Sequence, residues 1–209
     1  MEIEYFCQTS YNVFSSPNTE EYIDIAFNIA NTTYNLMTYS TDLDPEIVVF
    51  TEEGIKEYIL RYKQGPEEMF LCGIKAFRDE YGNLLPNQLG VTYEDDWVTR
   101  VPSRSTGSLV AVKTCIDFAA SDEYRLDYND LVTAMTIHEL GLQRGAVADE
   151  HLSTYPYPKF CIGHIDLILW LSQEREHPYW TTRYSNPHFC DECINGIKNI
   201  NWDNCVYSK

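Results

Sequence analysis

The sequence has few basic residues and no long hydrophobic run. Its 15 lysines and arginines stand against 32 aspartates and glutamates, which gives a net charge of −17. Such an acidic chain excludes the phosphate backbone of a nucleic acid as a partner. No apolar run approaches the ~20 residues that a membrane span requires, so we expect no membrane partner. The first residues also lack the basic and apolar regions of a signal peptide, which predicts a cytoplasmic protein.

The cysteines argue against a disulfide framework. There are seven, an odd number, and the last four are clustered: Cys161, Cys190, Cys193 and Cys205. A late cluster with a CxxC pair favours metal binding in a reducing compartment over disulfide bonds.

The apolar patterns predict an α/β (α+β) fold in which a mixed sheet packs with helices. A chain of 209 residues is long enough for a single domain, 1–209, with a real core. We expect sheet strands at Ile47 to Phe50, Phe70 to Phe77 and Ser108 to Phe118. Short strands are expected near Ile3 to Cys7 and Gly90 to Tyr93. Helices are expected at about 19–37, 52–63 and 129–143, with a terminal helix in 190–200.

The stretch from Asp127 to His151 contains a predicted helix and most of the candidate functional residues. Leu131, Met135, His138 and Leu142 recur at helical spacing and would share one helix face. Gly145 would end this helix, because glycine tolerates the left-handed turn.

Within the helix, His138-Glu139 opens the HExxH signature, in which two histidines one turn apart bind zinc and the glutamate activates water. The second histidine is replaced by Leu142. The alternative, without any function, is a packed histidine beside a solvated carboxylate.

With Gly145 at the glycine position, this stretch resembles the HExxHxxGxxH helix of the metzincin zinc peptidases. Phe160-Cys161-Ile162 and Phe189-Cys190-Asp191-Glu192-Cys193 are similar to the cysteine tail of the archaemetzincin branch. The resemblance implies a metzincin-like sheet, zinc on His138 and Glu139 as general base. The third ligand position is Ala148, so His151 is the nearest replacement, with Asp149 or Glu150 as oxygen ligands. Gly163 stands where the family has the methionine of its Met-turn.

A second constellation lies in the tail. Cys161-x-x-His164 and Cys190-x-x-Cys193 have the two-residue spacers that let four N/S ligands close a tetrahedral zinc site. His151 or Cys205 could instead complete the set. Such a metal would staple residues 152–209 onto the domain as a C-terminal subdomain. The alternative is that these are four reduced, independent side chains.

Two functions remain open. The first is an archaemetzincin-like zinc metallopeptidase, weakly active or inactive on peptides because its catalytic zinc site is incomplete. The alternative is a non-catalytic metzincin-like scaffold that binds a peptide or protein partner. Leu142 separates them, because an apolar side chain at a ligand position closes the catalytic site unless another group replaces it. A more distant reading is an unrelated α/β binding domain.

Overall fold

The computed structural model describes residues 2–7, 11–13, 19, 21, 23, 35–40, 47–64, 69–95, 103–121, 128–145, 189 and 191–199. A five-stranded sheet runs in the order β2-β1-β4-β7-β6, with β2 at Asn35–Ser40, β1 at Glu2–Cys7, β4 at Met69–Ile74, β7 at Gly107–Ala111 and β6 at Gly90–Tyr93. All neighbouring strands are parallel except β6, which runs antiparallel to β7. The sheet is therefore mixed, and the fold class is α+β, as the sequence predicts.

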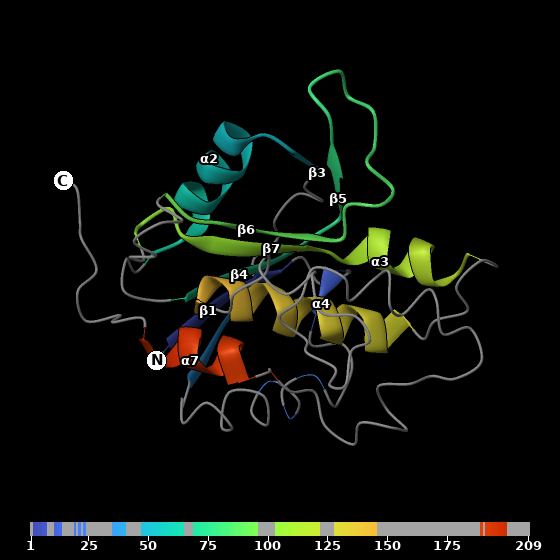
Figure 1. Ribbon diagram of the computed structural model, residues 1–209. Helices are drawn as coiled ribbons and strands as arrows, with labels where there is room; N and C mark the ends of the chain where they lie inside the picture. Colours follow the sequence, from blue (N-terminus) through green and yellow to red (C-terminus); the bar gives the residue numbers. More distant parts are fainter. Residues whose placement is uncertain are drawn as a thin grey trace.

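Helices cover both faces of this sheet, which makes three layers (Figure 1). On one face lies α2, Glu52–Tyr62, and on the other α4, Tyr128–Gln143. The central strand β4 is buried at all six positions, and its residues alternate between the two cores. Met69 and Leu71 join the cluster with α4, whereas Phe70, Cys72 and Ile74 join the cluster with α2. A strand covered on both faces reads as a continuous apolar run rather than an alternating one.

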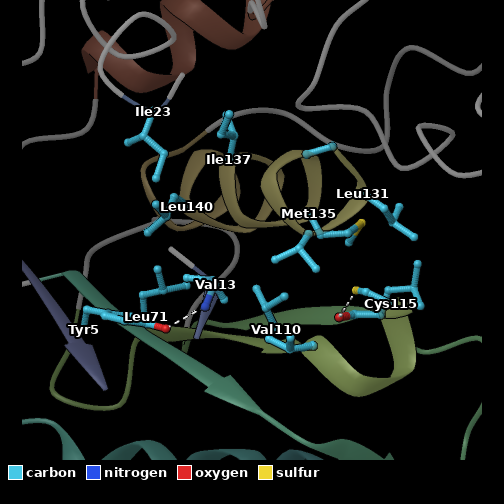
Figure 2. Packing of buried hydrophobic residues seen from close by; sticks show 14 of the residues in the cluster. Tyr5, Val13, Ile23, Leu71, Val110, Cys115, Leu131, Met135, Ile137 and Leu140 are labelled. Atoms are coloured by element: carbon cyan, nitrogen blue, oxygen red, sulfur yellow. Dashed lines mark hydrogen bonds between the residues drawn. The ribbon is translucent and has the colours of Figure 1, made fainter. Parts of the chain in front are cut away.

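Helix α4 is itself enclosed. Met135 and Leu140 point towards Leu71 and Val110 on the sheet, whereas Ile137 points the opposite way, towards Ile23 (Figure 2). The helix α7, Asp191–Asn199, contributes Cys193 and Ile197 to the same cluster. Part of the tail that the sequence assigns to a stapled subdomain, namely α7, thus belongs to the main core.

Helix α2 begins where the sequence predicts. The Thr51 hydroxyl accepts a hydrogen bond from the Gly54 amide at 3.1 Å, and Glu52 and Glu53 occupy the first turn, where the helix dipole favours negative charge. Ile55, Tyr58 and Ile59 form its buried face. The predicted helices 52–63 and 129–143, the terminal helix and the strands near 3–7 and 90–93 are confirmed.

The expected long strand from Ser108 to Phe118 is wrong beyond Ala111. The chain turns into α3, Val112–Ala119, immediately after β7. Val112, Cys115 and Ala119 are buried, which is helical spacing, and Lys113 pairs with Asp117 one turn later. The β-branched and apolar content of the segment fits a strand equally well, so the pattern alone misplaced the boundary.

Two other expectations need correction. The strand predicted for Phe70 to Phe77 is two strands, because β5, Ala76–Arg78, leaves the main sheet and pairs in parallel with β3, Ile47–Val49. The strand predicted at Ile47 to Phe50 is therefore β3, Ile47–Val49, of a separate two-stranded sheet. The predicted helix 19–37 ends too late, because residues 35–37 belong to β2 and pair with β1. The pairing with β1 outweighed a helical periodicity that Leu36 merely continued.

None of the helices in the described ranges has the length and apolar character needed to cross a membrane.

Candidate functional site

Helix α4 and the edge strand β6 enclose a cleft of about 340 Å³. Its floor comes from α4, and its opposite wall comes from β6 and the segment that leads into it. Its lining is mixed, with apolar and amide side chains beside one histidine and one carboxyl: Asn87, Gln88, Leu89, Gly90, Val91, Thr92, Met135, His138, Glu139 and Leu142. The cleft therefore contains the His-Glu pair that the sequence singles out.

The side chain of Glu139 lies between the α4 backbone and the sheet, and only 3% of the residue's surface is exposed. Its Oε2 lies 2.7 Å from the Thr92 hydroxyl on β6. A Cβ added to Gly90 would lie 2.5 Å from Glu139 Oε1, so any other residue at that position would force the carboxyl to shift. The alternative of a solvated carboxylate on a helix surface is thus wrong, because Glu139 is a buried group held against the edge strand.

The backbone of Glu139 is held as well. Its carbonyl oxygen accepts hydrogen bonds from Thr92 Oγ1 at 2.9 Å and from Ser108 Oγ on β7 at 3.0 Å. One turn later, Gln143 Nε2 donates to Ser108 Oγ at 2.8 Å. These bonds fix the last turn of α4 to two strands, so the position of the His-Glu pair is set by the sheet.

Gln143 makes a further pair of contacts. Its Oε1 accepts from the Phe70 amide and its Nε2 donates to the Phe70 carbonyl, each at 2.9 Å. Strand β4 pairs with β7 only from Leu71 onward, so the Gln143 amide serves as the hydrogen-bonding partner of Phe70 at that point. Buried backbone groups need such partners.

Burial raises the pKa of the Glu139 carboxyl to about 8, and the hydrogen bond from Thr92 lowers it only in part. At pH 7 the carboxyl is therefore mostly protonated. The Thr92 hydroxyl has one proton and lies within reach of both Glu139 O and Glu139 Oε2. A protonated carboxyl can supply the second proton.

His138 and Leu142 lie side by side in the cleft lining, one helical turn apart. His138 is 5% exposed and Leu142 is partly buried. The predicted shared face of Met135, His138 and Leu142 is thus real, and Leu142 occupies the place at which the zinc-peptidase pattern puts its second ligand. A leucine side chain has no lone pair to offer a metal.

Metal donors do not converge in the part of the chain that the structure describes: there, no three His, Cys, Asp or Glu side chains form a potential metal site. His151, Cys161, His164 and Cys190 lie outside the described residues, as do Asp149 and Glu150. Cys193 is described, and it is a buried, reduced cysteine on α7. His138 and Glu139 alone do not fit a catalytic zinc, which needs about three protein ligands.

Sequence reasoning missed the residues that hold Glu139 in place, namely Gly90, Thr92, Ser108 and Gln143. Gln143 is one turn from Glu139 on α4, but the others come from β6 and β7, so no spacing in the chain connects them to Glu139. The available signal was weak: Thr92 and Ser108 are hydroxyl residues in strands otherwise made of apolar residues, and a buried hydroxyl needs a partner.

Comparison of the sequence with models of known protein families gave no match, and comparison with curated proteins gave no significant one. The metzincin resemblance therefore depends on His138, Glu139, Gly145 and the late cysteines alone.

Proposed function

We propose that this chain is an archaemetzincin-like protein of the zinc-metallopeptidase type whose cleft binds an extended peptide and hydrolyses it weakly or not at all. The observation that carries the proposal is the cleft between α4 and β6, which brings His138 and Glu139 beside the edge of a sheet. A peptide or a protein segment is the partner class, and a nucleic acid or a membrane is not.

The outer edge of β6 offers backbone groups to such a peptide. The Ala111 amide donates to the Leu89 carbonyl at 2.8 Å, which starts the antiparallel pairing of β6 with β7. Antiparallel pairing alternates along the strand, so the backbone groups of Val91 and Tyr93 face β7 and those of Gly90 and Thr92 face outward. Among the described strands, none pairs with β6 on that side. An extended peptide can add there as a further strand.

The lining of the cleft indicates what kind of peptide fits. Leu89, Met135 and Leu142 supply an apolar wall, which suits an apolar side chain. The net charge of −17 attracts basic ligands at a distance, so a peptide with basic flanks would associate faster. We therefore infer an extended, basic peptide with an apolar residue at the cleft.

Hydrolysis is the weaker half of the proposal. If zinc binds in the cleft, His138 is a ligand, and further ligands would come from His151, Asp149 or Glu150. Zinc supplies an activated water when it is bound in such a site. Leu142 leaves His138 without its neighbouring ligand, so we expect low zinc occupancy and little cleavage.

Leu142 also favours the second candidate function, a non-catalytic scaffold that binds the same peptide in a cleft without zinc. Metal counting on the purified chain separates the two. Near two zinc ions per chain supports the peptidase, since the tail site proposed for Cys161, His164, Cys190 and Cys193 accounts for one. One ion supports the scaffold, and none removes both zinc assignments.

Reduced thiols at Cys72, Cys115 and Cys193 suit a cytoplasmic location.

The decisive experiment restores the missing ligand. Leu142→His should raise zinc content towards one additional ion per chain, measured by elemental analysis after dialysis against a zinc buffer. The matched control is Leu84→His, which places a histidine on an exposed leucine outside the cleft. Cleavage of a casein digest is then followed with and without a chelator.

The zinc content and the cleavage rate separate three outcomes. A gain of zinc in Leu142→His but not in Leu84→His supports a metallopeptidase-type cleft. Equal zinc content in both variants and the unmodified chain would contradict it. Chelator-sensitive cleavage by the unmodified chain, abolished by Glu139→Gln, would show that the chain is a competent peptidase, contrary to the weak or absent hydrolysis that we propose.

A further inference from the structure

One side chain already occupies the edge at which a peptide would add. Gln88 is half-buried and lines the cleft, and its Nε2 donates to the Gly90 carbonyl oxygen at 2.6 Å. The pairing of Leu89 with Ala111 turns that carbonyl outward, away from β7. Gln88 is thus hydrogen-bonded to one of the backbone groups that an added strand would use.

We propose that Gln88 is a self-cap of the β6 edge, which an incoming peptide must displace. Its amide N–H stands in for the N–H of an added strand, and the Gly90 carbonyl is the acceptor for which the two compete. The proposal rests on the proposed function, because it assumes that an extended peptide binds along β6. It makes Gln88 a selectivity residue, since the bond that Gln88 gives up is replaced best by a ligand that presents a backbone N–H at the Gly90 carbonyl.

The cap has a second physical effect on the same edge. An unpaired edge strand is a template for pairing with another chain, and proteins commonly blunt such edges with side chains. A glutamine amide satisfies the carbonyl without closing the edge permanently, because one neutral hydrogen bond exchanges for another at small net cost. Gln88 therefore weakens peptide binding to a limited degree, by roughly three- to tenfold.

Fluorescence anisotropy with a defined probe tests this. The probe is a fluorescein-labelled peptide, Lys-Thr-Leu-Thr-Leu-Thr-Lys, and the full chain is used with the metal it retains on purification, with probe integrity checked by mass spectrometry after each titration. Gln88→Met keeps the side-chain length and removes the donor. We expect it to bind the probe roughly three- to tenfold more tightly than the unmodified chain. The matched control is Gln64→Met, the same change at an exposed residue just after α2, which should bind within twofold.

A second readout reports displacement itself. The side-chain amide signals of Gln88, assigned in nitrogen-edited NMR spectra by their loss in Gln88→Met, should move towards the position of a solvated amide when the probe saturates the chain. Unmoved signals at saturation would overturn the proposal. A purely structural role for Gln88 would lower the urea midpoint of Gln88→Met and leave probe affinity unchanged.

The outcomes also separate this proposal from the one on which it rests. Probe binding that is equal or weaker in Gln88→Met refutes the self-cap and leaves peptide binding intact. No binding to any variant refutes both. Equal binding of a probe with N-methylated backbone amides refutes strand addition along β6, and with it the competition for the Gly90 carbonyl.

Discussion

Replacing Glu139 by glutamine should make the stability of this protein less dependent on pH. The substitution keeps the shape of the side chain and removes its titration. Thr92 can still donate to the remaining oxygen, and the new amide can donate to Thr92 in its turn. Space under Gly90 is not altered, because the amide is nearly the same size as the carboxyl.

The magnitude follows from the raised pKa. Glu139 has a pKa of about 8 in the folded chain, against 4.5 for the ordinary group. A carboxyl whose folded pKa is raised contributes stability that is fully present below the unfolded pKa and is lost as pH rises through the folded pKa. Between pH 5 and pH 7.5, the unmodified chain should therefore lose roughly 3 kcal/mol of unfolding free energy that Glu139→Gln does not lose.

Urea unfolding followed by circular dichroism at pH 5, 6.5 and 7.5 measures this, with chelator present throughout. The quantity of interest is the difference in unfolding free energy between Glu139→Gln and the unmodified chain. Titrating groups far from residue 139 are common to both chains and cancel in that difference. Glu57→Gln, the same substitution at an exposed position on α2, serves as the control for the chemical change itself.

A difference that does not grow with pH would refute the reasoning. It would mean that the pKa of Glu139 in the folded chain is close to its ordinary value, and therefore that water or a cation reaches the carboxyl. A difference that shrinks with pH would mean that a positive group stabilises the carboxylate, which would point to a ligand set outside the described residues.

Three further predictions concern the same framework. Gln143→Met should lower the unfolding free energy by roughly 3 kcal/mol, because it strips the Phe70 amide and carbonyl of their partner; a urea midpoint close to that of the unmodified chain would contradict this. Gly90→Ala should destabilise the chain, and should cost less in a Glu139→Ala background, since the added Cβ lies 2.5 Å from a carboxyl oxygen; a double-mutant cycle with zero coupling argues against that contact. Cys190→Ser should release about one zinc ion per chain and make residues 152–209 more sensitive to a protease, and unchanged metal content and digestion would rule out the tail site.

The sequence predicts this fold best where one local pattern decides the structure. Helix α2 has its cap in Thr51 and its buried face at helical spacing, so its bounds follow from the chain itself. The β7–α3 boundary does not, because apolar and β-branched residues continue across it and only pairing with β6 and β4 determines where the strand stops. For the same reason, the assignment of β3 and β5 to a separate sheet could not be read from their apolar runs.

The candidate site divides in the same way. His138 and Glu139 are adjacent in a recognisable pattern, and their place on a helix followed from the spacing of Met135 and Leu142. The burial of Glu139 did not follow, because it depends on a glycine and a threonine almost 50 residues earlier. Contacts of this kind are set by how β6 lies against α4, which no local pattern records.

The amide of Gln143 has a consequence for the order in which the protein folds. Phe70 and Gln143 are 73 positions apart in the chain, yet the side chain of one completes the backbone pairing of the other. Strand β4 can align with its neighbours before α4 arrives, and its first residues pair with β1, but the Phe70 amide and carbonyl lack the Gln143 partner until the last turn of the helix docks. Contacts this distant in sequence are formed late and slowly, because a long loop must be closed first. A nascent chain that ends before residue 143 would therefore lack the side chain that pairs with the Phe70 amide and carbonyl at the start of β4.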